Sequence, residues 1–387
     1  MSQAFFEAAK QVWGKAPKEK KYTVTIEGKE IEVSLEKNLE IMKHGEEAFM
    51  LQDEKIVRRP IKKNNLKKPI LKKQLPGKLG SRGGICMADR IRVSDLDFVY
   101  ISYMEPNKEE NWADLKDKVP WAKRVDGVKG FDSAHKAAAK KAETDFFISV
   151  DGDNIIDEQF LLQTLDWEKT NKKAVHRWRA KNNINGLVYG NGGLVGWDKE
   201  TCLEMKTHEN SITEENQIDF CWGVPHENLH NCYSTTVINA TPQQAFVAGY
   251  REGVKMSTEK GKPITAKNYN KSIWRNNLNI LSTWCTIGAD IDNGKYAMLG
   301  ARMGCFYTVI EPNNEFFKIR DLTELENYFA ELAVENGNID EELQLFGNSL
   351  RQQLDIPIAE YCEDDSKFYR FIMPQHRNKG VQDREYQ

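Results

Sequence analysis

Two carboxylates, one residue apart, follow an apolar segment near the middle of the chain. Residues 146–150 (Phe-Phe-Ile-Ser-Val) are rich in aromatic and β-branched side chains and follow an alanine-rich stretch at 134–142. This order predicts a helix and then a buried central strand. The turn Asp151–Asn154 (Asp-Gly-Asp-Asn) comes next. Open α/β sheets bind ligands outside the carboxyl ends of their strands, so the sequence predicts a ligand site at this turn.

The chemistry of this turn favours a divalent cation. Asp151 and Asp153 offer hard oxygen ligands, and Mg²⁺ or Mn²⁺ is often held by one or two carboxylates together with substrate phosphates. Asp-Gly and Asp-Asn pairs also form ordinary turns after strands, because Gly and Asn tolerate left-handed backbone angles. A metal-bridged nucleotide and a plain turn are therefore both open readings of the motif.

The bulk composition is that of a globular protein that functions in the cytoplasm. The chain has 387 residues, of which 40% are hydrophobic, which suits one large or two modest domains. No apolar run approaches the roughly 20 residues of a membrane helix, and the first residues lack the pattern of a secretory signal. The seven cysteines contain no C-x-x-C pair, so we expect reduced thiols and neither a zinc site nor a disulfide framework.

Charge is distributed unevenly along the sequence. The net charge is −3, yet residues 55–78 contain ten basic residues and no acidic one. Interspersed prolines favour an extended arm there, and such an arm suits a polyanion, with nucleic acid as the expected partner. A solvated linker is the alternative. The residues we expect to contact nucleic acid are Arg58, Arg59, Lys62, Lys63, Lys67, Lys68, Lys72 and Lys73.

The elements predicted along the chain define three regions. Residues 1–90 form an accessory region with an amphipathic helix at 5–13, a hairpin at 22–35, a short helix at 39–50 and the basic arm. Residues 91–315 form an α/β domain with strands at 98–103, 125–128 and 146–150, a helix or loop at 112–118 and a helix at 133–142. Residues 316–387 form a helical extension and a polar tail. Strand, helix and strand at this spacing predict a Rossmann-like, mostly parallel sheet.

Further along, an unusual run of Asn and Gly follows a strand expected at 174–180. Residues 182–197 (Asn-Asn-Ile-Asn-Gly-Leu-Val-Tyr-Gly-Asn-Gly-Gly-Leu-Val-Gly-Trp) suit a backbone that approaches a ligand closely, or two linked tight turns. A helix is predicted at 242–256, opening with Pro at its first position. Within it, Arg251 and Glu252 are candidates for polar side chains that face a site.

Taken together, these segments resemble nucleotide-sugar glycosyltransferases of the GT-A fold. They resemble more narrowly the base J glucosyltransferase group and related phage enzymes, including 5-hydroxymethylcytosine glucosyl- and arabinosyltransferases, which glycosylate hydroxymethylated pyrimidines in DNA. The similarity covers roughly residues 95–305. It is carried by segments 124–128, 134–138, 151–154, 178–193 and 242–253.

The resemblance implies a UDP-sugar donor, carrying glucose or arabinose, and Mn²⁺ or Mg²⁺ that bridges its diphosphate. Asp153 would hold the metal, and Asp151 would hold it as well or contact the ribose of the donor or a metal-bound water. A third metal ligand would come from His226, His230 or Asp292. The donor site would further include Ser102, Tyr103, Arg124, His135, Asn182, Asn191, Gly192 and Gly193.

The same resemblance implies that the acceptor is the hydroxymethyl oxygen of 5-hydroxymethylcytosine or 5-hydroxymethyluracil in DNA. A phage-encoded enzyme would act in the host cytoplasm. The acceptor hydroxyl needs a general base, for which Asp219, Asp292 and Glu252 are candidates, with Asp290 beside them. A base extruded from a duplex would stack on Trp222 or Trp197.

Three other functions are open at this stage. One is a GT-A transferase that acts on protein or polysaccharide. Another is a metal-dependent nucleotidyltransferase, and the third is a nucleic-acid binder without catalytic activity.

Overall fold

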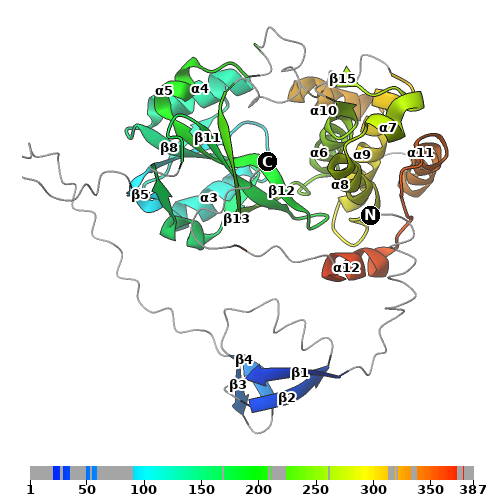
Figure 1. Cartoon of the computed structure of the whole chain (residues 1–387), viewed down its shortest axis with the longest axis horizontal. Coiled ribbons are helices and arrows are strands. Elements are labelled where there is room, and N and C mark those ends of the chain that lie inside the picture. Colours follow the sequence, from blue (N-terminus) through cyan, green and yellow to red (C-terminus); the bar gives the residue numbers. More distant parts are fainter. Residues whose placement is uncertain are drawn as a thin grey trace, which may run out of the picture. The chain divides into compact units, whose positions relative to one another are not determined.

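The protein, seen here in a computed structural model, forms two compact units, residues 1–85 and 86–387 (Figure 1). The structure describes residues 90–167, 170–207, 210, 224–259, 262–312, 319, 321–332, 338–372 and 378, with the backbone alone at 191 and 192. In the first unit it describes the backbone of four strands.

The first unit contains two antiparallel hairpins. Strands β1 (Lys21–Ile26) and β2 (Lys29–Ser34) pair from Lys21 opposite Ser34 to Ile26 opposite Lys29, which confirms the predicted hairpin. Strands β3 (Phe49–Gln52) and β4 (Lys55–Arg58) form the second. The helix predicted at 39–50 is wrong at its last two residues, which begin β3, and its earlier residues lie outside the described part, as does the helix predicted at 5–13.

The second unit is built on a mixed seven-stranded sheet in the order β7-β6-β8-β12-β11-β13-β9. Strands β7, β6 and β8 run parallel, β12 is antiparallel to both β8 and β11, and β13 runs parallel to β11 and antiparallel to β9. The strand bounds are β6 Asp97–Ser102, β7 Lys123–Asp126, β8 Phe146–Asp151, β9 Asn154–Ile156, β11 Val175–Asn182, β12 Val188–Asp198 and β13 His226–Thr236. The sheet is compatible with the expected Rossmann-like α/β class.

Helices α3 (Lys108–Lys118) and α4 (Phe131–Lys141) connect the parallel strands from opposite faces of the sheet. One core contains Phe98, Tyr100 and Leu115 of α3, and the other contains Val99 and the alanines of α4. This alternation follows from the two-residue period of β6. Because β6 has β7 on one side and β8 on the other, the strand order reverses between β6 and β8, and such a reversal is the usual ligand crevice of open α/β sheets.

The Asn- and Gly-rich run is mainly a strand, contrary to the expected ligand loop or pair of turns. Only residues 183–187 form a turn, and 188–198 make up β12, which pairs with β11 on one side and β8 on the other. Gly and Asn have low intrinsic strand preference, but a central strand that hydrogen-bonds on both sides is fixed by its neighbours. The short helix α5 (Lys199–Glu204) follows it.

The rest of the second unit is mostly helical (Figure 1). Helices α6 (Pro242–Lys255) and α9 (Gly294–Val309) pack closely and form its centre. Around them lie α7 (Tyr269–Ser272), α8 (Arg275–Thr286), α10 (Leu322–Glu331), α11 (Ile339–Leu354) and α12 (Glu363–Ile372). Short two-residue and three-residue strands complete the unit: β5 Arg90–Arg92, β10 Thr164–Asp166, β14 Thr258–Glu259 and β15 Lys262–Pro263.

Glycines explain how closely α6 and α9 approach. A Cβ added at Gly249 or Gly253 of α6 would overlap the carbonyl oxygens of Ala297 or Ala301 on α9. The glycines of α9 at 300 and 304 meet the α6 backbone in the same way. Small residues at this spacing let two helix backbones touch, so each helix fixes the position of the other. Among the described residues, no helix is long and apolar enough to cross a membrane.

Candidate active site

A cavity of about 420 Å³ opens where the strand order reverses. Its floor comes from the carboxyl ends of β6 and β8 and from the start of α4, and its opposite wall comes from α6, α8 and the start of α10. The predicted acid pair, Asp151 and Asp153, lies in this floor. The sequence-based expectation of a site at this turn therefore coincides with a cavity in the structure.

The backbone of the acid turn is held from three directions. The Gly152 carbonyl accepts hydrogen bonds from the Tyr100 hydroxyl (2.7 Å) and from Asn111 Nδ2 (2.9 Å). The N–H of Val237, just after β13, donates to the Asp153 carbonyl at 2.7 Å. Both carboxylates therefore project from a turn whose main chain is fixed before any ligand arrives.

Asn154 also orients the carboxylate of Asp153. Its Nδ2 donates to Asp153 Oδ1 at 2.7 Å, and its Oδ1 lies 3.3 Å from the Thr236 hydroxyl. The Asn154 carboxamide occupies the place where a Cβ of Gly193 would stand, since such an atom would come within 2.6 Å of Asn154 Oδ1 and closer still to Nδ2. Gly193, which we expected at the donor site, thus makes room for the residue that positions Asp153.

Three carboxylates share the acid side of the cavity. Burial, the nearby Asp153 and Glu105 raise the pKa of Asp151 well above its usual value. Burial and Glu105 raise the pKa of Asp153 to about 6, although Asn154 and Arg251 act in the other direction. Glu105 approaches so closely that a Cβ on Gly152 would lie 2.7 Å from its carboxylate. A nearby negative charge, like burial, destabilises the ionised form of a carboxylate.

This arrangement fits a divalent cation that is only partly coordinated by protein. A cation between Asp151 and Asp153 would relieve the repulsion that raises both pKa values. Within the part of the chain that the structure describes, no group of three or more His, Cys, Asp or Glu side chains has a metal-binding arrangement. Mg²⁺ is commonly bound through one or two carboxylates, and takes its other ligands from substrate phosphates and water.

The wall opposite the acid pair carries basic and hydrogen-bonding side chains from α6. Arg251 is near enough to lower the pKa of both aspartates, and its guanidinium carbon lies 5.7 Å from the centre of the Phe131 ring. Its buried Nε has no hydrogen-bond partner among the described residues. An arginine that is held beside two carboxylates, and whose Nε–H has no hydrogen-bond partner among the described residues, is suited to bind an anionic ligand.

Glu252 belongs to a hydrogen-bonded cluster in the same wall. It accepts a hydrogen bond from the Tyr189 hydroxyl at 2.8 Å, and Lys255 Nζ lies 3.2 Å from its other oxygen. Trp284 Nε1 in turn donates to the Tyr189 hydroxyl at 3.2 Å. All four side chains line the cavity. Glu252 is therefore the one described candidate base that faces the cavity.

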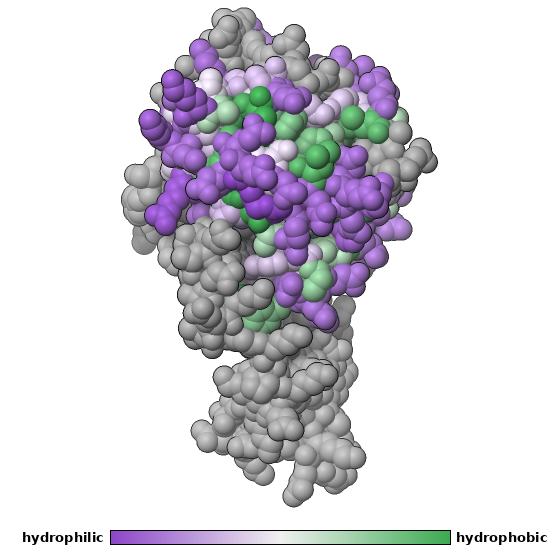
Figure 2. Space-filling model, turned by 90° about the vertical axis from the view of Figure 1, so that its right-hand side faces the viewer, coloured by the Kyte–Doolittle hydropathy of each residue, from purple (hydrophilic) through white to green (hydrophobic). Residues whose placement is uncertain are grey.

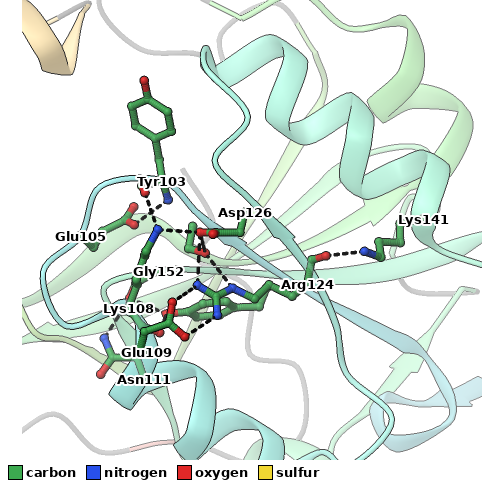
Figure 3. Close-up of polar contacts among 11 residues, drawn as sticks. Tyr103, Glu105, Lys108, Glu109, Asn111, Arg124, Asp126, Lys141 and Gly152 are labelled. Atoms are coloured by element: carbon green, nitrogen blue, oxygen red, sulfur yellow. Dashed lines mark hydrogen bonds and ion pairs between the residues drawn. The ribbon is translucent and has the colours of Figure 1, made fainter.

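The structure places Arg124 in an ion-pair network beside the cavity instead of in its lining (Figure 3). Two of its nitrogens donate to Glu109 at 2.7 Å, a third lies 3.2 Å from the Ser102 hydroxyl, and it also pairs with Asp126 at 3.2 Å. Lys108 bonds to Asp126 and to the Tyr103 carbonyl. Arg124 is thus paired with Glu109 and Asp126 and lies outside the cavity lining, and its contact with the nucleoside stays a prediction.

Other expected donor-site residues lie at the cavity, with different roles. Ser102 and Tyr103 line it at the end of β6, and the Ser102 hydroxyl donates to Asp126 at 2.7 Å. His135 is buried at its edge, where its Nδ1 lies 2.8 Å from the Phe131 carbonyl and burial lowers its pKa, so it is neutral at pH 7. Asn182 also lines the cavity, but its Oδ1 accepts from the N–H groups of residues 184 and 185 and so shapes the turn before β12.

Several predicted residues do not join the site. His226 is exposed at the start of β13, at the opposite edge of the sheet from Asp153, so it cannot complete the same metal centre. Asp292 is exposed outside the cavity lining, and Asp290 forms an ion pair with Arg370. His230, within β13, is also not part of the lining. Trp197 is fully buried, with its Nε1 donating to Ser149, so it cannot stack on an extruded base.

Some predictions lie beyond the described residues. Asp219 and Trp222 are outside them, and Asn191 and Gly192 have only their backbone described, within β12. Of the basic arm, Arg58 ends strand β4, and the residues from 59 to 78 are outside the described part. The described residues do not test these predictions.

Three charged side chains are among the cavity residues that the sequence analysis did not single out. Glu105 follows β6, and its position after the end of a parallel strand was the available signal. Lys255 lies one helical turn beyond Arg251 on the same face of α6. Glu326 comes from α10, a helix far along the chain that no local pattern connects with the acid turn.

No protein-family model, curated protein or solved structure matches this chain. What can be proposed for its function therefore comes from its own sequence and its own cavity.

Proposed function

We propose that the chain is a metal-dependent glycosyltransferase of the GT-A fold that moves a sugar from a UDP-sugar to a hydroxymethylated pyrimidine in DNA. The observation that carries the proposal is the cavity at the β6–β8 reversal, in which Asp151 and Asp153 face Arg251 and Glu252. It combines a carboxylate pair suited to a bridging cation, a cation suited to phosphate and a carboxylate suited to proton transfer.

In this proposal the donor lies along the floor of the cavity. Ser102 and Tyr103, at the end of β6, would contact the nucleoside, and the diphosphate would lie between Asp153 and Arg251. A divalent cation, when bound, would neutralise the charge that develops on the leaving UDP. Arg251 would supply a second positive charge to the same phosphates, and its position over Phe131 limits its freedom before the donor binds.

Glu252 is the proposed general base. The acceptor hydroxyl is a poor nucleophile until its proton is removed. In the transfer, the bond from the sugar C1 to the UDP oxygen breaks, a bond from C1 to the hydroxymethyl oxygen forms, and the hydroxyl proton passes to Glu252. Tyr189 and Lys255 hold its two oxygens, which fixes the carboxylate in the cavity wall.

The acceptor would be a base turned out of its stack. A base inside a duplex cannot reach a cavity of this kind, so either extrusion or a single-stranded substrate is required. The basic arm at residues 55–78 would contribute affinity for the phosphate backbone, which is largely independent of sequence.

The direct test is to incubate the full chain with DNA containing 5-hydroxymethylcytosine, MnCl₂, and UDP-glucose or UDP-arabinose. Nucleosides released by digestion are then analysed by mass spectrometry. We expect a glycosylated nucleoside with at least one donor and none after metal is removed with EDTA. Transfer to protein or polysaccharide alone would move the assignment to another acceptor, and release of pyrophosphate from a triphosphate would indicate a nucleotidyltransferase.

Matched variants separate the proposed roles. Asp153→Ala and Glu252→Gln should each lower turnover at least about a hundredfold, as expected for the loss of a metal ligand or a general base. Asp292→Asn is the control, because this exposed carboxylate lies outside the cavity lining. Full activity of Glu252→Gln together with an inactive Asp219→Asn would transfer the role of base to Asp219.

A further inference from the structure

A second basic segment lies in the helical part of the protein. Residues 260–289 contain five basic residues and no acidic one. Among them, Lys267, Lys271 and Arg275 recur at intervals of four residues, and Trp274 lies beside the last. We call these four residues the Trp274 surface.

Trp274 projects into solvent because the chain changes direction there. Helix α7 ends at Ser272, residues Ile273 and Trp274 are extended, and α8 begins at Arg275. The side chain of Trp274 is 68% exposed. Its indole makes no hydrogen bond, ring contact or cation–π contact with any residue that the structure describes. Most of this indole therefore stays in contact with water and is available to a ligand.

The neighbouring cations are also free of internal partners. Lys267, Lys271 and Arg275 are all exposed, and none forms an ion pair with a carboxylate in the described ranges. The amino terminus of α8 has no side-chain cap and no acidic residue in its first turn. Three cations and an uncapped helix end thus make this surface positive in a protein whose net charge is negative. Figure 2 shows how hydrophilic and apolar side chains alternate over the face on this side of the molecule.

We propose that the Trp274 surface binds an unstacked stretch of nucleic acid, with a base stacked on Trp274 and phosphates held by Lys267, Lys271 and Arg275. Proteins that bind single strands combine an aromatic platform for bases with cations for the backbone. A protein partner would be expected to cover more apolar area than one indole, and an apolar ligand would not need three cations. Charge complementarity therefore favours a nucleic-acid strand.

Helix α8 connects this surface to the cavity. Trp284, which lines the cavity, lies near the end of α8, ten residues beyond Trp274, or about 15 Å at the usual rise of a helix. A few nucleotides of a single strand span this distance, since even stacked nucleotides are about 3.4 Å apart. The strand that flanks a target base in the cavity could therefore rest on Trp274. The identity of this strand as acceptor DNA rests on the proposed function, but binding itself does not.

Binding of fluorescent oligonucleotides by the full chain, followed by anisotropy without any sugar donor, tests the proposal. Two strands of equal length are compared, oligo-dT and an abasic deoxyribose-phosphate strand. Trp274→Ala should weaken binding of oligo-dT about tenfold and leave the abasic strand within about twofold, because only the first offers bases to stack. The control Leu345→Ala removes a similarly exposed apolar side chain, 60% exposed on α11, and should change neither.

Charge reversal tests the phosphate contacts. The triple variant Lys267→Glu, Lys271→Glu and Arg275→Glu should weaken binding of both strands and lower the slope of log affinity against log salt by about 2. The control reverses Lys140, Lys172 and Lys206, which are exposed on the sheet side and change the net charge equally.

The binding measurements can contradict the proposal in two ways. Equal losses in the two triple variants, or an unchanged affinity of Trp274→Ala for oligo-dT, would overturn the proposal. Because no donor is present, a failure to transfer sugar in the separate activity assay would leave a positive binding result standing.

Discussion

Replacing Gly193 by alanine should disturb the acid turn through a side chain that binds no ligand itself. The new Cβ would overlap the carboxamide of Asn154, which is buried and has little space to move. The carboxamide of Asn154 would have to move away from its present position, and its hydrogen bonds to Asp153 (2.7 Å) and Thr236 (3.3 Å) would be lost. Overpacking costs about 1–3 kcal/mol, and each lost hydrogen bond costs about 1 kcal/mol. We expect the free energy of unfolding to fall by about 3–5 kcal/mol, the sum of these costs.

The same strand provides the control. A Cβ on Gly190 would have no atom within 4 Å, so Gly190→Ala should leave the free energy of unfolding within about 0.5 kcal/mol or raise it slightly. Urea unfolding of both variants measures the difference. In an Asn154→Ala background the clash disappears, so Gly193→Ala should cost much less there, and the double-mutant cycle gives the coupling. Equal stability of the two glycine variants, or additive costs in the cycle, would refute this reasoning.

Three further predictions concern the frame and the charge of the site. Gly249→Ala should lower the melting temperature by several degrees, because its Cβ would overlap the Ala297 carbonyl on α9; an unchanged melting curve would contradict the close packing. Asp97→Ala should lower the free energy of unfolding in urea by about 2–4 kcal/mol, because this carboxylate accepts hydrogen bonds from the N–H groups of residues 143–144 and pairs with a lysine. A decrease of less than about 0.5 kcal/mol would contradict this role. In metal-free protein the pKa of Asp153 in the folded state, about 6, exceeds the usual value of an aspartate, 3.8, because the carboxylate is buried beside Glu105. The folded state then holds the proton more tightly, so stability should fall as pH rises from about 4 to 6, and Asp153→Asn should flatten that fall in melting temperature.

Local patterns predict the first half of the sheet well. Each of β6, α3, β7, α4 and β8 carries its own signal, an apolar strand or an alanine-rich helix, and the observed bounds differ from the predicted ones by a few residues. The largest difference in a strand is at β7, which runs from Lys123 to Asp126 and begins two residues before the expected 125–128. The acid turn follows from the same local reading, because its position depends only on where β8 ends.

The second half depends on contacts that a local pattern does not record. Strand β12 contains glycines and asparagines that favour turns, and its pairing with both β8 and β11 decides the outcome. Helices α8, α9 and α12 were not predicted, although Trp284 and the glycines of α9 prove central to the cavity and the core. The separation of Arg124 from the cavity likewise depends on Glu109, which only the folded helix α3 brings within reach.

The close packing of α6 against α9 has a consequence for the timing of any catalytic cycle. Helix α6 carries Arg251 and Glu252, and its backbone approaches that of α9 closely at four glycines. This close packing opposes sliding of one helix along the other, so we expect the two helices to move together as one rigid wall. We therefore expect entry and release of ligands to depend on the cavity segments outside this helix pair, which are the start of α10 and the residues before α3 and α4. Amide hydrogens of α6 and α9 should accordingly exchange only when the whole unit unfolds.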